Sequence, residues 1–359
     1  MSTSLSTAGP KVIGKEYPKY DERELVDEYL KLLQEQMLRT YSNGPKKKKQ
    51  LRQIHPKMNG CVKAEFIIEP NLPGELRVGL FKESRSYYAW IRFSNGQTHS
   101  VPDYKKDFRG FAIKIMNVPG KKLDPTDPDI TCHDFILMNT KNFAASDVKK
   151  FMEVLFVVTT PWKLNNVFKK IKIVIDNWSV KKAGDKAKIN IMNPAEIPYF
   201  STVPFRFGDE SRAVKYAVFP RSNDKLLTPD KTSEHLLRSN LAATLKEDQL
   251  EFDFCIQFQT DAEKMPIEDP TVIWDSEFIK LATIRIPTQI FDTPERNEFG
   301  DNLTFNPWHC LQEHQPLGSF NRLRRMIYEE MYEFRLKHND VTDSEPNAGP
   351  DFFNDTNLK

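Results

Sequence analysis

The chain has 359 residues, enough for one large domain or two ordinary ones, and its 39% hydrophobic and 28% charged content is typical of a globular protein. Fifty-two basic residues against fifty acidic ones leave a net charge of +2, which excludes a bulk field that would attract nucleic acid. The four cysteines form no CxxC pair, no apolar run approaches the roughly eighteen residues of a membrane span, and the N-terminus lacks the apolar core of a signal peptide. We therefore expect a cytoplasmic protein without a stable membrane anchor.

The elements can be predicted in chain order from the spacing of apolar residues. Residues 1–20 are polar and are expected to be flexible, and residues 22–41 carry apolar side chains at helical spacing. Further helices are predicted after Asp147 and over 319–338, and the polar tail 339–359 is expected to be disordered. Alternating apolar residues predict strands at 62–68, 76–80, 87–94, 111–115, 214–218, 252–258 and 281–285.

This order of elements predicts an α+β fold, a closed antiparallel β-barrel surrounded by helices, in a single domain over 21–338. The strand at 87–94 is the most informative, because its two faces differ. A cation and a hydroxyl beside an indole are unusual for a solvent face, so the second face is predicted to line a cavity. The two faces are Tyr87, Ala89, Ile91 and Phe93 on one side and Trp90, Arg92 and Ser94 on the other.

Two basic stretches have simple interpretations. The run Lys46–Lys49 is predicted to be a solvated loop after the first helix. The segment from Trp162 through Phe168 to Trp178 is basic and aromatic. A helix packed on the domain is the simpler interpretation of this segment, and contact with a lipid surface is the alternative.

Three short motifs carry residues that suit peroxide chemistry. Arg324 and Tyr328 are four residues apart on a predicted helix, so the guanidinium can stabilise a phenolate, the form of tyrosine that ligates ferric haem. His55 directly precedes a strand, three residues after Arg52, and an imidazole can accept and return a proton near neutral pH. Asn139 follows an apolar run, and its neutral amide can orient a peroxide oxygen. Each motif alone also fits a purely structural residue.

Taken in order, these motifs resemble the haem catalases. The segments RFS (92–94), RGFAIK (109–114), DFILMNTKNFAASD (134–147) and FNPWHCLQEHQPLGSFNRLRRMIY (305–328) are most similar to the short catalase-related proteins that include the allene oxide synthase domains of corals. The resemblance implies haem b as the cofactor, with Tyr328 as the proximal iron ligand and Arg324 as its charge partner. It also implies catalytic roles for His55, Asn139 and Ser94, the last holding the imidazole. Further haem-binding residues would be Arg52 and Arg92, at the propionates, and Phe151, on the porphyrin face.

The implied activity is that of a haem-dependent catalase or peroxidase acting on hydrogen peroxide or an organic hydroperoxide. The alternatives are a fatty-acid hydroperoxide isomerase or dehydratase of the allene oxide synthase type, and a non-enzymatic haem carrier or sensor. One departure matters, because Asn95-Gly96 stands where typical catalases have Thr-Val, whose valine narrows the route to the iron. A wider approach is therefore expected. Whether the chain forms a homo-oligomer is left open by the sequence, and neither NADPH binding nor an interlocked tetramer is expected.

A competing metal site and a competing ligand also stay open. Four potential zinc ligands lie within six residues, although their spacing is not HExxH and no second cluster completes the set. Tyr332, one helical turn beyond Tyr328, would be the alternative haem ligand. The four potential zinc ligands are His309, Cys310, Glu313 and His314.

Overall fold

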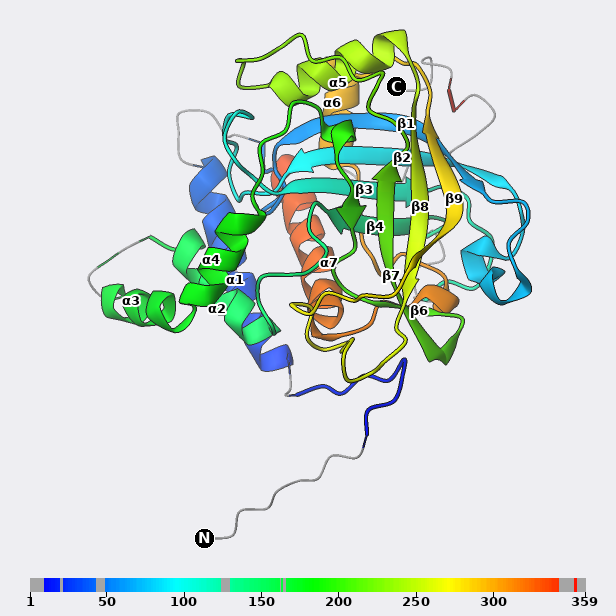
Figure 1. Cartoon of the computed structure of the whole chain (residues 1–359). Helices are drawn as coiled ribbons and strands as arrows, with labels where there is room; N and C mark the ends of the chain where they lie inside the picture. Colours follow the sequence, from blue (N-terminus) through cyan, green and yellow to red (C-terminus); the bar gives the residue numbers. More distant parts are fainter. Residues whose placement is uncertain are drawn as a thin grey trace.

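The computed structural model describes residues 10–19, 22–42, 49–123, 130–161, 163, 166–341 and 352–353. Within them, eight antiparallel strands close into a barrel in the order β1-β2-β3-β4-β5-β7-β8-β9, and β6 adds to the edge of β7 (Figure 1). This confirms the predicted closed barrel. The strands are β1 (Met58–Ile68), β2 (Ser86–Asn95), β3 (Arg109–Ile115), β4 (His133–Met138), β5 (Tyr199–Phe200), β6 (Phe205–Phe207), β7 (Asp209–Pro220), β8 (Leu250–Phe258) and β9 (Phe278–Ile286).

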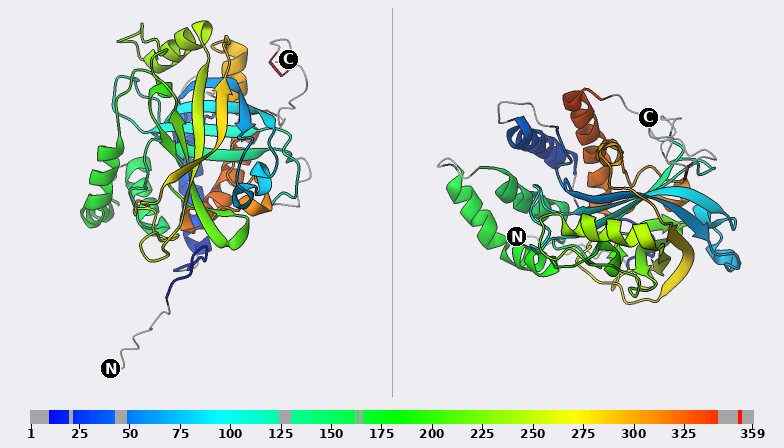
Figure 2. Two further views of the ribbon diagram at one scale, coloured as in Figure 1. Left: turned by 45° about the vertical axis from the view of Figure 1, so that its right-hand side comes forward. Right: turned by 90° about the horizontal axis from the view of Figure 1, so that it is seen from above.

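Seven α-helices surround the barrel in the described part of the chain. The helices predicted near the two ends of the chain are confirmed as α1 and α7, which lie side by side against one side of the barrel (Figure 2). The helix predicted after Asp147 is confirmed as α2, and the Asp147 side chain caps it by accepting a hydrogen bond from the Lys150 N–H. The helices are α1 (Arg23–Ser42), α2 (Val148–Thr159), α3 (Val167–Asp176), α4 (Trp178–Ala187), α5 (Leu236–Glu247), α6 (Pro294–Asn302) and α7 (Ser319–Asn339).

Strand β2 has the two faces that its sequence predicts. Ala89, Ile91 and Phe93 point into the barrel and join the main apolar core. The opposite face is also buried, because α6 and the segment after it cover it, and Trp90 packs with its ring centroid 4.6 Å from that of Phe299 in α6. The charged and hydroxyl side chains of this face therefore lie in the interior, between the barrel and its helices.

The strand predicted at 76–80 is wrong. This segment forms two short 3₁₀ helices, Gly74–Leu76 and Gly79–Phe81, which still bury Leu76 and Leu80. Gly79 has a φ of +50°, which a strand cannot accommodate, and a Cβ there would lie 2.5 Å from Nε2 of His314. Apolar alternation over five residues was thus produced by a pair of tight turns.

Much of the two segments predicted to be flexible or disordered, 1–20 and 339–359, lies outside the described residues, as do Trp162 and residues 46–48 of the two basic stretches. The described part of the N-terminal segment packs on the barrel, where Gly14 N–H donates to Oε1 of Gln259 at 2.8 Å. In the C-terminal tail, Phe352 is buried and its ring stacks on Tyr88 with the centroids 4.9 Å apart. Among the described helices, none combines the length and the apolar character needed to cross a bilayer.

Candidate functional site

His55 lies against strand β2, where it contacts two side chains. Its Nδ1 is 3.0 Å from Oγ of Ser94, and its carbonyl accepts a hydrogen bond from Nη2 of Arg92 at 3.0 Å. The predicted contact between Ser94 and the ring is present. The residue has a φ of +61°, in the left-handed region that a non-glycine residue rarely adopts outside functional sites. The backbone is therefore held in a strained conformation, with the ring against Ser94 and Gly110.

The imidazole of His55 is kept neutral by its surroundings. Burial lowers its pKa to about 3, and the nearby guanidiniums of Arg92, Arg324 and Arg52 act in the same direction. A neutral ring can accept a proton across the physiological pH range. Arg324 belongs to α7, so one of these charges comes from the helix that carries Tyr328.

Gly110 of β3 packs directly against the imidazole of His55 and the hydroxyl of Ser94. A Cβ at Gly110 would lie 2.6 Å from Nδ1 of His55 and 2.7 Å from Oγ of Ser94. Both distances are far inside van der Waals contact, so the ring and the hydroxyl occupy the space that a side chain would fill. The RGF motif of the sequence contains this glycine, but nothing in the sequence indicates which side chains pack over it.

Three arginines gather on the other side of the site, of which Arg92 and Arg335 are buried and Arg52 is partly buried. Burial lowers the pKa of Arg52, Arg92 and Arg335, that of Arg335 to about 9, and Asp301 is the carboxylate that raises all three. Nε of Arg92 is buried and has no hydrogen-bond partner within the described residues. One carboxylate cannot neutralise three guanidiniums, so this region has an excess of buried positive charge. A dianionic ligand would balance it.

The backbone of α6 supports two of these arginines. Arg52 donates from Nη1 to the carbonyls of Gly300 and Asp301, at 3.3 and 3.1 Å, and from Nη2 to the carbonyl of Leu303. Arg335 of α7 donates to the same Asp301 carbonyl at 2.8 Å. The negative end of the α6 dipole therefore stabilises both cations, but with a partial charge only.

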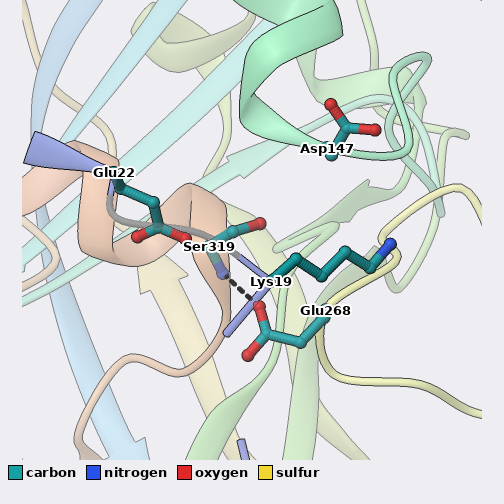
Figure 3. Close-up of a pocket in the computed structure, with 5 residues that line it drawn as sticks. All are labelled: Lys19, Glu22, Asp147, Glu268 and Ser319. Carbon is teal, nitrogen blue, oxygen red and sulfur yellow. Dashed lines mark hydrogen bonds between the residues drawn. The ribbon is translucent and has the colours of Figure 1, made fainter. Parts of the chain in front are cut away.

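Arg322, two residues before Arg324 on α7, is surrounded by carboxylates instead. Its guanidinium pairs with Glu16, with Glu22 at 2.8 Å and with Glu268 at 2.9 Å. Burial lowers the pKa of Arg322, but the hydrogen bonds to Glu22 and Glu268 outweigh this effect and raise the pKa above its ordinary value. Figure 3 shows the crevice beside this cluster, in which Glu268 accepts a hydrogen bond from the Ser319 N–H at 3.0 Å. This acidic cluster fixes the first turn of α7, and it shows how a structural arginine of this protein is neutralised.

Helix α7 carries both candidate tyrosines. Arg324 donates to Oδ1 of Asn321 at 3.2 Å, one turn earlier on the same helix. Tyr328 is half-buried, and the phenols of Tyr328 and Tyr332 both act on the pKa of Arg52. The ring of Tyr332 is covered by Arg335, whose guanidinium carbon is 5.3 Å from the ring centroid. Tyr328 is the less encumbered of the two.

Asn139 is fixed at the end of β4 by hydrogen bonds on both sides. Its Oδ1 accepts from the Arg109 N–H at 2.8 Å, and its Nδ2 donates to the carbonyl of Ala187, at the end of α4, at 2.9 Å. One N–H of the amide and one lone pair of its oxygen remain for a ligand. The residue therefore joins the barrel to α4 as well as standing beside the site.

The aromatic residue predicted on the porphyrin face packs with two others. The ring centroid of Phe151 lies 5.2 Å from that of Phe143 and 5.6 Å from that of Phe320, at the start of α7. This trio joins α2 to α7.

The wide approach expected beside Gly96 is wrong at that point. A Cβ at Gly96 would lie 2.5 Å from Cβ of Phe108 and 3.3 Å from Cε1 of His55. The phenylalanine, which is half-buried, therefore occupies the space that the missing valine leaves, and its ring reaches to 3.9 Å from a Cβ placed on Gly184 of α4. Any open route must pass to one side of it.

A cavity lies near the site, on the side of the loop after β2. A half-open cavity of about 310 Å³ lies between α1, the loop after β2 and the end of α2. Gln36 of its wall accepts a hydrogen bond from Gln53 at 3.1 Å, two residues before His55. The lining residues are Gln36, Arg39, Thr98, His99, Val158, Thr159 and Pro161.

The four potential zinc ligands at 309–314 do not converge. His314 points into the barrel, where Nδ1 is 3.2 Å from the hydroxyl of Tyr216, while His309 lies outside it, with Nδ1 3.7 Å from Oδ2 of Asp134 and 3.9 Å from Sγ of Cys132. The buried ammonium of Lys114 is 3.1 Å from both Sγ of Cys132 and Oδ2 of Asp134. The ammonium of Lys114 therefore already balances the charge of Asp134. The sequence did not predict this buried group.

Comparisons with known proteins identify the fold. The chain is similar to three solved structures described as a bacterial catalase (TM-score 0.59, 16% identity), a fungal catalase (0.58, 14%) and catalase A from Saccharomyces cerevisiae (0.58, 14%). It is covered to 94%, 94% and 99%, and it spans 66%, 67% and 76% of those chains respectively. No family model and no curated protein matches the sequence. The fold is therefore catalase-like.

Proposed function

We propose that this chain binds haem and catalyses the breakdown of a hydroperoxide. The observation that carries the proposal is the pairing of a neutral His55 with an excess of positive charge at the buried Arg92 and Arg335 and the partly buried Arg52. Haem b supplies two carboxylates for the arginines and an iron for a phenolate ligand, so its chemistry fits the residues on both sides of the site.

Each residue then has a definite task. Arg92, with its unpartnered Nε, would hold a propionate together with Arg52 and Arg335, and Tyr328 would ligate the iron. When bound, the haem supplies the redox chemistry of O–O cleavage.

Proton transfer falls to the imidazole. Ser94 occupies Nδ1 of His55, which leaves Nε2 to take the proton of the hydroperoxide and return it to the departing oxygen. Asn139 would orient the peroxide with its remaining N–H.

A second candidate is the isomerisation or dehydration of a fatty-acid hydroperoxide. The cavity of about 310 Å³ beside the site favours it, because hydrogen peroxide needs far less room.

The test is a haem titration of the purified chain, followed by addition of hydrogen peroxide and, separately, of a fatty-acid hydroperoxide. Oxygen release with hydrogen peroxide selects the catalase activity, and loss of the lipid hydroperoxide without oxygen release or a reductant selects the second candidate. His55→Ala should keep haem binding and lower turnover by roughly 10²–10⁴-fold. Turnover that survives this change would show that His55 is not the acid–base group, whereas an unchanged chain that binds haem without turnover would favour a haem carrier or sensor over an enzyme.

A further inference from the structure

One surface of the molecule is apolar although no described part of the chain covers it. Phe168 is 82% exposed, Ile175 68% and Trp178 59%, and Ile171 is also exposed. Phe168, Ile171 and Ile175 are spaced i, i+3 and i+7 on α3, so they form a single stripe along the helix. We call these four residues the α3 face.

The α3 face is held in place by the helices behind it. The ammonium of Lys170, on the opposite side of α3, is buried and donates to the carbonyls of Val157, at 3.0 Å, and Thr160 at the end of α2. At the corner between α3 and α4, the buried Asn177 donates to Oε2 of Glu153 of α2 at 2.9 Å. These contacts orient the stripe outward, and Figures 1 and 2 show α3 on the outside of the molecule, with α2 and α4 between it and the barrel.

The same segment concentrates positive charge. Residues 163–188 contain eight lysines and two aspartates, a net charge of +6 in a chain whose total is +2. Lys172 and Lys182 are exposed, and each is next to an apolar residue of the face at helical spacing. The rest of the chain is net negative, so this charge belongs to one surface and not to the protein as a whole.

We propose that the α3 face is a docking surface for an anionic lipid bilayer. Phe168, Ile171, Ile175 and Trp178 would enter the interface between headgroups and acyl chains, and the lysines around them would contact the lipid phosphates and carboxylates. Exposed phenylalanine, isoleucine and tryptophan within a ring of lysines is the composition of peripheral membrane helices. A second copy of this chain fits less well, because two lysine-rich faces repel each other.

The position of this surface relates it to the site. Val158, 62% exposed at the end of α2, helps to form the wall of the cavity of about 310 Å³, and Lys170 of α3 donates to the carbonyl of the residue before it, Val157. A docked molecule would hold this cavity near the bilayer. If the proposed function is correct, the substrate class is then a hydroperoxide of a membrane lipid or its fatty acid, and this consequence alone rests on the proposed function.

The experiment is flotation of the full chain with vesicles of phosphatidylcholine, with and without 30 mol% phosphatidylserine. We expect binding to the anionic vesicles that weakens as salt is raised. F168S/I175S should weaken partitioning by about tenfold or more, and K172Q/K182Q by roughly ten- to thirtyfold. Fluorescence from Trp178 should shift to shorter wavelength on binding and should be quenched by brominated lipids, and W178F should remove this response.

The control is I290S, which replaces an exposed isoleucine in the loop after β9, 66% exposed and remote in sequence from the face. It should bind vesicles like the unchanged chain. Three results would overturn the proposal: no binding to either vesicle, equal binding of F168S/I175S, or a dimer in solution that F168S/I175S dissociates while vesicles leave the chain unbound. None of these readouts requires haem, so failure of the membrane proposal and failure of the peroxide proposal are separate results.

Discussion

A single methyl group at Gly110 should disable the candidate site without unfolding the protein. The Cβ of Gly110→Ala would lie 2.6 Å from Nδ1 of His55 and 2.7 Å from Oγ of Ser94, so these two groups must separate. Both clashing atoms are at the ends of side chains, and not in the backbone, so they can move. We expect the 3.0 Å contact between them to break and the imidazole to turn away from its present position.

The expected magnitudes separate stability from activity. Overpacking of this kind costs about 1–3 kcal/mol of the free energy of unfolding, while misplacing a general acid–base group lowers turnover by roughly 10²–10⁴-fold. Urea denaturation measures the first quantity, and peroxide consumption by the haem-loaded protein measures the second. Ser94→Ala removes the same hydrogen bond without a clash, so it should lower turnover in the same direction at a stability cost of about 1 kcal/mol.

Gly74→Ala is the matched control. A Cβ at Gly74 would meet no heavy atom within 4 Å, so neither stability nor turnover should change. If Gly110→Ala binds haem and retains full turnover, the imidazole does not act from the position described above, and the reasoning from its contacts is refuted.

Three further predictions rest on buried charge. Arg92→Met should weaken haem binding by about tenfold or more in a haem titration, yet leave the apoprotein no less stable to urea, because it removes a buried cation in excess; a large loss of apoprotein stability would contradict this. Asp134→Asn removes the carboxylate that pairs with the buried Lys114, so it should lower the free energy of unfolding, measured by urea denaturation, by about 3–5 kcal/mol. Asp185→Asn, in an exposed ion pair, should lower it by only about 0–1 kcal/mol, and equal losses in the two variants would contradict the prediction. Finally, the free energy of unfolding should fall by up to about 1.4 kcal/mol per pH unit per histidine as the pH drops below about 6.5 towards 3. The reason is that burial lowers the pKa of three histidines, so only the unfolded chain takes up their protons; a pH-independent stability in this range would count against it. They are His55 and His314, with pKa values of about 3, and His133.

The barrel could be predicted because its strands repeat a local pattern. In β2 the alternation of Ile91 and Phe93 with Arg92 and Ser94 specifies both the strand and the two different faces, and the structure buries both. The same rule failed at Leu76–Leu80, because Gly79 requires a positive φ that alternation does not reveal. An apolar run of only five residues was too short to distinguish a strand from a pair of turns.

The candidate site was only partly predictable, since its chemistry depends on contacts between distant segments. The contact of Ser94 with His55 was expected, but the packing of both over Gly110 was not. The convergence of Arg335 with Arg52 depends on how α7 crosses the end of α6, which no local pattern encodes.

The same limit applied to the surface. The 162–178 segment allowed either a packed helix or a lipid contact, and only the exposure of Phe168 and Ile175 in the folded chain favours the second interpretation.

The measurement that tests the central claim most directly is a haem titration followed by absorption spectroscopy on three chains: unchanged, Tyr328→Phe and Tyr332→Phe. We predict that the unchanged chain binds one haem with a ferric tyrosinate spectrum, that Tyr328→Phe loses this spectrum, and that Tyr332→Phe keeps it. A colourless unchanged chain would contradict the haem site altogether. Loss of the spectrum only in Tyr332→Phe would move the iron ligand by one helical turn and contradict the assignment of Tyr328.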